Sequence, residues 1–114
     1  MTVQYKNAPF NLTTTNLTTV LTIAADSRAI VKGFNMTNEH NNNVLVEGFV
    51  HDSSESTEFE FFHKLLSSDS TEKDACGQAL VLEESDSIKM RAATASTVQG
   101  VISYSLINRS QENG

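Results

Sequence analysis

Short apolar segments with a two-residue period recur along the chain, and clusters of Ser, Asn and Asp separate them. Two such segments are AIVKGFNMTN, at 29–38, and SIKMRAA, at 87–93. Side chains with this period alternate between the two faces of a β-strand, whereas Asn and Ser clusters favour turns. Ala, Leu, Lys and Glu do not gather into windows that favour a helix. The pattern therefore constrains the chain to short strands joined by turns.

The fold class follows from the number and spacing of these segments. About seven or eight strands, at spacings of roughly 8 to 15 residues, predict an all-β chain. A length of 114 residues suits one domain with its own core. We therefore expect a single antiparallel β-sandwich of the jelly-roll or Greek-key type, at 16–108. An N-terminal arm at 1–15 and a flexible tail at 109–114 would flank it.

One predicted strand contains a charged residue on its apolar side. In the segment 29–38, Ile30, Lys32, Phe34 and Met36 share a face at period two. Because Lys32 interrupts that face, either a β-bulge at Gly33 or an interface is expected there.

Alternation also assigns the faces of the segment TEFEFFHKLL. Phe59 and Phe61 are predicted to point inward, whereas Glu58 and Glu60 face solvent. The acidic cluster EESDS, at 83–87, separates two apolar segments and predicts a sharp corner between two strands, where charge also discourages unwanted edge pairing.

The charge balance excludes several classes of partner. The chain has 14 acidic and 8 basic residues, a formal net charge of −6. This argues against sequence-independent binding to nucleic acid, which depends on Lys and Arg, and against an acidic membrane surface. The first residues lack a basic segment followed by an apolar one, so we expect a product that is not exported. Cys76 is the single cysteine, so no intrachain disulfide is expected.

The residue types that support catalysis or metal binding are few. His40, His51 and His63 are the three histidines, and His51 with Asp52 could bind a metal if His63 came near. Glu58 and Glu60 have the spacing of a carboxylate pair that could flank a sugar bond. Both patterns are also typical of solvated strand surfaces. We therefore predict a protein that is not an enzyme, with no catalytic, cofactor-binding or metal-binding residues.

Two long stretches resemble a known family. They are TTVLTIAADSRAIVKGFNMTNEHNNNVLVEGFV and LVLEESDSIKMRAATASTVQGVISYSLI, and they span most of residues 13–107. Their order of features, with a threonine-rich entry, an asparagine turn and a corner ending in Asp-Ser-Ile, resembles small β-sandwich virion proteins of tailed bacteriophages. Ser85 departs from the family pattern, which has a small residue or Gly before Asp86.

The resemblance implies a structural role in a virion. A capsid decoration or cement protein is the leading hypothesis: it would be made in the host cytoplasm, bind the major capsid protein on the outer surface of the head and act as a homo-oligomer, with a trimer favoured. A neck, tail or baseplate component is one alternative. A carbohydrate-binding jelly roll is another, although the chain has no Trp and only two Tyr.

Apolar residues outside the predicted core are candidates for partner contacts. The N-terminal segment would either dock into a neighbour through its aromatic residues or form an edge strand of its own sandwich. Strands that are apolar on both sides would provide further contacts. The predicted partner-binding residues are Tyr5, Pro9, Phe10, Leu45, Phe49 and Val101.

Overall fold

The structure, a computed structural model, describes residues 2–72 and 79–108. Cys76 and the predicted tail at 109–114 lie outside the described residues. Within them, every regular element is a strand, and no helix is long and apolar enough to span a bilayer. The strands are β1 (Thr2–Leu12), β2 (Thr18–Thr22), β3 (Ser27–Asn38), β4 (Val44–Asp52), β5 (Thr57–Leu66), β6 (Ser70–Glu72), β7 (Leu80–Leu82), β8 (Ser87–Ala92) and β9 (Val98–Asn108).

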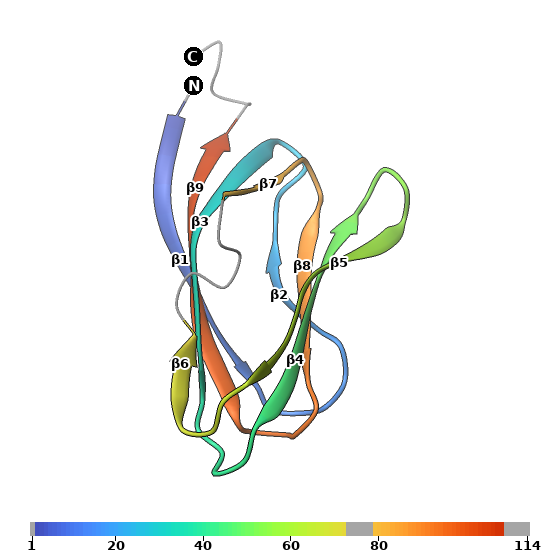
Figure 1. The fold of residues 1–114 in the computed structure, drawn as a ribbon. Coiled ribbons are helices and arrows are strands. Elements are labelled where there is room, and N and C mark those ends of the chain that lie inside the picture. The colour runs from blue at the N-terminus through green and yellow to red at the C-terminus, as the bar shows by residue number, and fades with distance from the viewer. Residues whose placement is uncertain (1, 73–78, 109–114) are drawn as a thin grey trace.

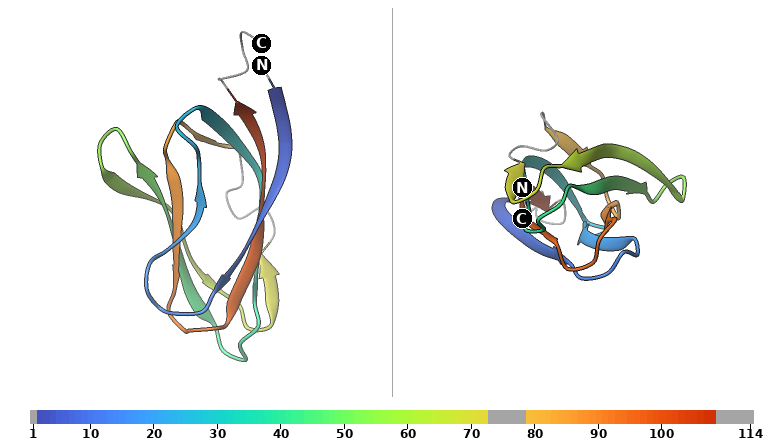
Figure 2. Two further views of the ribbon diagram at one scale, coloured as in Figure 1. Left: turned by 180° about the vertical axis from the view of Figure 1, so that it is seen from behind. Right: turned by 60° about the horizontal axis from the view of Figure 1, so that its bottom comes forward.

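The strands form two antiparallel sheets that face each other (Figures 1 and 2). The first sheet has the order β1-β9-β3, and β6 and β7 both pair with the far edge of β3. The second sheet has the order β2-β8-β4-β5. If β6 and β7 together count as one edge strand, this is the eight-strand order of a jelly roll. The predicted all-β antiparallel sandwich is therefore confirmed.

The N-terminal segment is part of the sandwich. β1 pairs with β9 over its whole length, from Thr2 opposite Asn108 to Leu12 opposite Val98. This arrangement is the edge-strand alternative for that segment. The division of the chain at residue 15 remains a prediction. The short strand β6 pairs with the end of β3.

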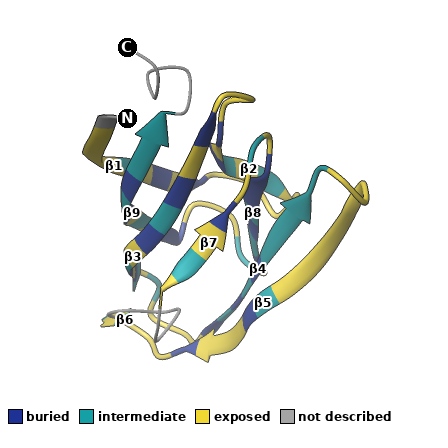
Figure 3. Cartoon of the chain, turned by 90° about the horizontal axis from the view of Figure 1, so that it is seen from above, coloured by how far each residue is buried: buried dark blue, intermediate teal, exposed yellow. Residues whose placement is uncertain are grey.

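A β-bulge in β3 removes Lys32 from the apolar side of the strand. The register of β3 against β9 shifts between Val31 and Gly33. Before the bulge, Ala29 and Val31 are buried, and after it Phe34 and Met36 are buried (Figure 3). The bulge expected near Gly33 is confirmed. Its extra residue shifts the phase of the strand by one position, so Ile30 does not share the inward face with Phe34.

β5 has a bulge of its own, and only part of the strand is covered. The register against β4 shifts where Phe61 is the extra residue, so that Gly48 lies opposite Phe62. Phe62 is buried, and Phe61 packs against the core as predicted. Phe59 was wrongly predicted to be inside. It lies opposite Val50, but its side chain is 51% exposed because the β4–β5 hairpin extends away from the first sheet (Figure 1).

Phe34 lies at the centre of the core. Its ring makes edge-to-face contacts with Phe10 of the first sheet and Phe61 of the second, each with centroids 5.9 Å apart. Such contacts contribute about 0.5–1.5 kcal/mol each beyond the burial of apolar area. Phe34 therefore joins the edge strand β1 to the opposite sheet.

Asn38 closes one end of the sandwich. Its side chain is fully buried, and Nδ2 donates to the carbonyl oxygens of Leu66 at 3.2 Å and of Ser67 at 3.1 Å. Oδ1 accepts a hydrogen bond from the backbone N–H of His40 at 2.9 Å. A buried amide that satisfies both its donor and its acceptor fixes the end of β3 to the end of β5, and so fixes one sheet to the other.

Asp86 organises the acidic corner between β7 and β8. Its buried carboxylate accepts hydrogen bonds from the backbone N–H groups of Glu83 at 3.0 Å and Ser53 at 3.1 Å. Ser85, just before it, has a left-handed backbone with φ of 67°. Glycine adopts that conformation without strain, whereas a residue with a side chain adopts it at some cost. The corner predicted from the sequence is confirmed.

Replacing Asp86 tests how much this corner stabilises the fold. Asp86→Ala leaves the N–H groups of Ser53 and Glu83 without their acceptor, and we expect the free energy of unfolding to fall by about 2 kcal/mol. Urea denaturation would measure the change. The control is Glu83→Ala, which removes an exposed carboxylate from the same corner and keeps the backbone N–H that donates to Asp86, with an expected loss of about 0.5 kcal/mol or less. Equal losses in the two variants would contradict the assignment.

Candidate interaction surfaces

The six predicted partner-binding residues lie in three different places. The register puts Tyr5, Pro9 and Val101 on the outer side of the first sheet. Leu45 and Phe49 lie on the outer side of the second sheet. Phe10 does not provide an exposed aromatic anchor, because its ring is buried in the core against Phe34. The structure thus does not bring the six together, and their role in partner binding remains a prediction.

The outer side of the first sheet, which we call the β1 face, exposes several apolar side chains among mostly uncharged polar ones. It consists of the outward residues of β1, β9, β3, β6 and β7. Its most exposed apolar side chains are Tyr5 at 82% and Val81 at 62%, with Val3 and Val101 beside them. None of the outward strand residues of this face is Asp or Glu. In an acidic chain, such a surface is suited to contact with another protein.

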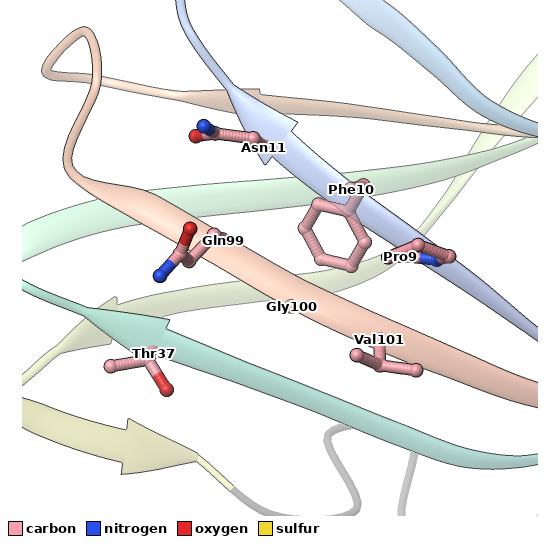
Figure 4. A pocket seen from close by; sticks show the side chains of 7 residues that line it. All are labelled: Pro9, Phe10, Asn11, Thr37, Gln99, Gly100 and Val101. Carbon is pink, nitrogen blue, oxygen red and sulfur yellow. The ribbon is translucent and has the colours of Figure 1, made fainter.

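A shallow groove of about 500 Å³ crosses the β1 face at Gly100 (Figure 4). Its lining residues are Pro9, Phe10, Asn11, Thr37, Gln99, Gly100 and Val101. Gly100 has no side chain because there is no room for one. A Cβ at Gly100 would overlap the carbonyl oxygen of Asn35 and lie 2.8 Å from Cζ of Phe10. Gly100 lies opposite Phe10 and Met36, which are both buried, so glycine at this position leaves room on the core side of the sheet.

The outer side of the second sheet, which we call the β4 face, is charged. Glu47 lies between the strand neighbours Arg91 and His63. Its Oε1 pairs with the Arg91 guanidinium at 2.9 Å, and that guanidinium also lies 5.5 Å from the centre of the Phe49 ring. Partial burial alone would raise the pKa of Glu47, but the hydrogen bond from Arg91 and the nearby positive charges hold it below its usual value.

Glu58 occupies a similar position nearer the tip of the hairpin. Its carboxylate accepts a hydrogen bond from Nζ of Lys89 at 3.0 Å and lies 3.4 Å from Nδ1 of His51. The hydrogen bond from Lys89 lowers the pKa of Glu58 below its usual value, with a smaller contribution from His51. Glu58 and Glu60 are each paired with a different cation or imidazole, so the arrangement describes a solvated ion-pair surface.

The histidines take part in separate local contacts. His40 Nδ1 accepts a hydrogen bond from the backbone N–H of Asn42 at 2.9 Å. His63, considered as a partner of His51 and Asp52, lies instead 3.2 Å from Glu60 and 3.4 Å from Glu47. The possible ligand atoms of Glu47, Glu60 and His63 lie within 4.8 Å of one another, close enough to hold a cation. Glu47 of this group already pairs with the Arg91 guanidinium.

Sequence reasoning missed two exposed residues of the β1 face, Val3 and Val81. The signal for Val3 was present, because Val3 and Tyr5 alternate at period two ahead of Pro9. A proline is tolerated on an edge strand, so it does not argue against a strand there. The signal for Val81 is weaker, since it is the middle residue of a three-residue strand, LVL.

Solved structures of other proteins share this fold. A chain of the capsid of Helicobacter pylori bacteriophage KHP30 aligns with a TM-score of 0.56 and 12% identity, over 96% of this chain and 90% of that chain. A chain of infectious bursal disease virus, Gx strain, aligns with a TM-score of 0.57 and 9% identity, over 97% of this chain but only 33% of that chain.

A protein outside viruses is similar as well. A chain of the Bacillus endospore appendages, a family of disulfide-linked pili, aligns with a TM-score of 0.50 and 13% identity, over 92% of this chain and 86% of that chain. No protein-family profile matches the sequence, and no curated protein matches it. At these identities the likeness concerns the fold alone, a β-sandwich that both viral and non-viral proteins share.

Gly100→Ala tests the steric requirement for glycine at this position of β9. The added methyl must displace Phe10 or the backbone of β3, so we expect the free energy of unfolding to fall by about 3 kcal/mol. Gly33→Ala is the matched control, because its Cβ would lie 3.4 Å from Cβ of Ser103, and we expect a change within about 1 kcal/mol. Thermal and urea denaturation measure both. Equal stability of the two variants would contradict the packing described.

The pairing of Glu58 with Lys89 predicts a pH dependence. Since the pKa of Glu58 is lowered from 4.5 in the folded state, its contribution to stability is present above pH 4.5 and is lost as pH falls through the folded pKa. Lys89→Gln should raise that pKa, whereas Lys64→Gln, which removes a cation paired with Glu72, should not. Carboxyl-carbon NMR titration measures both values. A Glu58 pKa unchanged by Lys89→Gln would show that the pairing does not persist in solution.

Proposed function

We propose that the chain is a non-enzymatic structural protein of a bacteriophage virion. The fold supports a structural role, because capsid and pilus proteins share it. The described polar clusters are ion pairs on open sheet surfaces. Two stretches of the sequence resemble virion proteins of tailed bacteriophages, and the fold is similar to that of a phage capsid chain. Both resemblances support the same assignment.

The observation that carries the proposal is the β1 face. It exposes Tyr5, Val81, Val3 and Val101 together on one side of a chain whose acidic residues lie elsewhere. Apolar surface without carboxylates loses little hydration of charge when it is covered. It is therefore the side on which a second protein can bury area most favourably.

Decoration of the capsid is the specific role that we propose. The protein would bind the major capsid protein at the outer surface of the head and stabilise the shell. A homotrimer would contact several capsid subunits at once, and linked weak contacts of this kind combine into high avidity. In this arrangement the β1 face supplies the partner contact, and the charged β4 face remains in water.

Two other roles remain as alternatives. A neck, tail or baseplate component would use the same surface against a different virion protein. A carbohydrate-binding module is favoured by one observation, the groove at Gly100, whose lining includes the polar side chains of Asn11, Thr37 and Gln99. The aromatic ring in that groove, Phe10, is buried, which leaves little surface for a sugar to stack upon.

Light scattering and co-sedimentation with capsids of the encoding phage test the proposal. We expect a trimer that pellets with capsids that lack tails. Tyr5→Ser combined with Val101→Ser should lower the bound fraction about tenfold, since such apolar contacts dominate interfaces. Leu65→Ser is the control, because this exposed leucine lies on the β4 face.

The other outcomes separate the alternatives. A protein that ignores capsids but pellets with tails would replace decoration by a tail role. Binding on a glycan array, without binding to either particle, would favour the carbohydrate module.

A further inference from the structure

The outer edge of β1 has no strand beside it within the described residues. β1 pairs with β9 along all of its 11 residues without a register shift, and β9 is its only neighbour in that part of the chain. Its N-terminal half lies at the margin of the sandwich, and residues 3–7 are all exposed (Figure 3). This edge therefore presents a row of backbone groups with which a further strand can pair.

Pro9 indicates which backbone groups of β1 face outward. Proline cannot donate to a ladder, so in an edge strand it lies where its missing N–H would face solvent. Alternate residues of an antiparallel strand turn their N–H and C=O groups to the same side. Consistent with this, Leu12, of the opposite set, accepts a hydrogen bond at its carbonyl oxygen from the N–H of Ser96, just ahead of β9, at 3.0 Å. The residues that turn these groups away from β9 are therefore Val3, Tyr5 and Asn7.

The other edges of the two sheets carry features that discourage an added strand. β2 has five residues and a register shift, and β6 and β7 have three residues each. β5 has a bulge and carries the charged residues Glu58, Glu60 and Lys64. Short length, bulges and charge all oppose pairing at an edge. Because β1 is long and regular, it is the edge at which pairing is opposed least.

The charge along this edge is positive in an acidic chain. Lys6 is the one charged residue of β1, and β9 has none. Neither strand contains a carboxylate, although the chain has a net charge of −6. The register places Lys6 on the opposite side of β1 from Val3 and Tyr5, which are 49% and 82% exposed. An added strand would thus meet apolar side chains on one face and an ammonium group on the other.

We infer that the outer edge of β1, over residues 2–8, binds an extended acidic segment of a partner protein as an additional strand. Backbone hydrogen bonds would supply affinity, and alternate side chains would supply specificity. The segment that fits has apolar residues beside Val3 and Tyr5 and carboxylates beside Lys6. Pro9 ends the pairing, because it offers no donor. The inference goes beyond the proposed virion role and does not rest on it.

A second copy of the chain fits this edge less well than an acidic segment. Antiparallel pairing of two β1 strands about Tyr5 would place Lys6 of one copy opposite Gln4 of the other. The two Lys6 side chains would then be diagonal neighbours on one face, where like charges repel. Lysine on an edge strand is a common protection against such self-pairing. Lys6 therefore disfavours a second copy and favours a carboxylate.

Titration with the blocked heptapeptide Val-Glu-Val-Glu-Val-Glu-Val, followed by amide hydrogen exchange in the full chain, tests the inference. In the free chain we expect fast exchange at Val3, Tyr5 and Asn7, and slower exchange at Gln4 and Lys6, whose N–H groups face β9. The peptide should slow exchange at the first three residues about tenfold or more and leave the other two nearly unchanged.

Two control peptides separate strand pairing from attraction between charges. The same peptide with N-methylated valines lacks the donors that would face β1, so it should give no protection. The peptide with Lys in place of Glu should bind about tenfold more weakly or less, because Lys6 repels it. The net negative charge of the chain alone would predict the reverse order of affinity.

Two matched pairs of variants locate the site. Lys6→Glu should reverse the order of the two charged peptides, whereas Lys64→Glu, which changes the charge of the other long edge strand, β5, should not. Tyr5→Pro removes one outward N–H and spares the pairing with β9, so affinity for the Glu peptide should fall about tenfold. Tyr5→Val keeps that N–H and should change the affinity by less than about threefold.

Several results would overturn the inference. They are no protection by the Glu peptide at millimolar concentration, equal protection by the N-methylated peptide, and equal loss in Tyr5→Pro and Tyr5→Val. Protection of the outward amides in the free chain that grows with protein concentration would assign the edge to a second copy instead. Sedimentation with capsids is a separate measurement, so failure of the strand pairing and failure of the virion role are distinguishable.

Discussion

The extra residue in β3 is the constraint on which the rest of the sandwich depends. β3 pairs with β9, β6 and β7, so its phase decides which side chains of the first sheet face inward. A strand with strict alternation could bury either Ala29 and Val31 or Phe34 and Met36, but not both pairs. The bulge allows Val31 and Phe34 to be buried in the same core. It costs some regular pairing, and that cost is offset by apolar burial on both sides of it.

The two outer faces differ in composition: ion pairs lie on the β4 face, and several exposed apolar side chains lie on the β1 face. On the β4 face, each described carboxylate lies within a few ångströms of a cation or an imidazole, as Glu47 lies beside Arg91. Exposed pairs of this kind contribute little to stability individually, yet they keep that face strongly hydrated. The β1 face has no such pairs among its outward strand residues, apart from Arg28 at its margin with Glu84. Only the β1 face is therefore suited to desolvation when another protein covers it.

Local periodicity was enough to predict the sandwich, the corner at Asp86 and the bulge at Gly33, because each depends on residues near one another in sequence. The exposure of Phe59 could not be predicted in this way, since it depends on how far the opposite sheet extends. The burial of Phe10 depends on Phe34, a contact between distant strands.

The pairing of Thr2 with Asn108 has a consequence for how such a domain can be joined to others. Both ends of the described chain leave the sandwich at the same point (Figure 1). A unit with adjacent ends can be inserted into a surface loop of a larger protein without stretching either the host or the guest, and it also tolerates circular permutation. This geometry allows the sandwich to be inserted as one unit into another protein. The directions of β1 and β9 would then set its orientation on that protein.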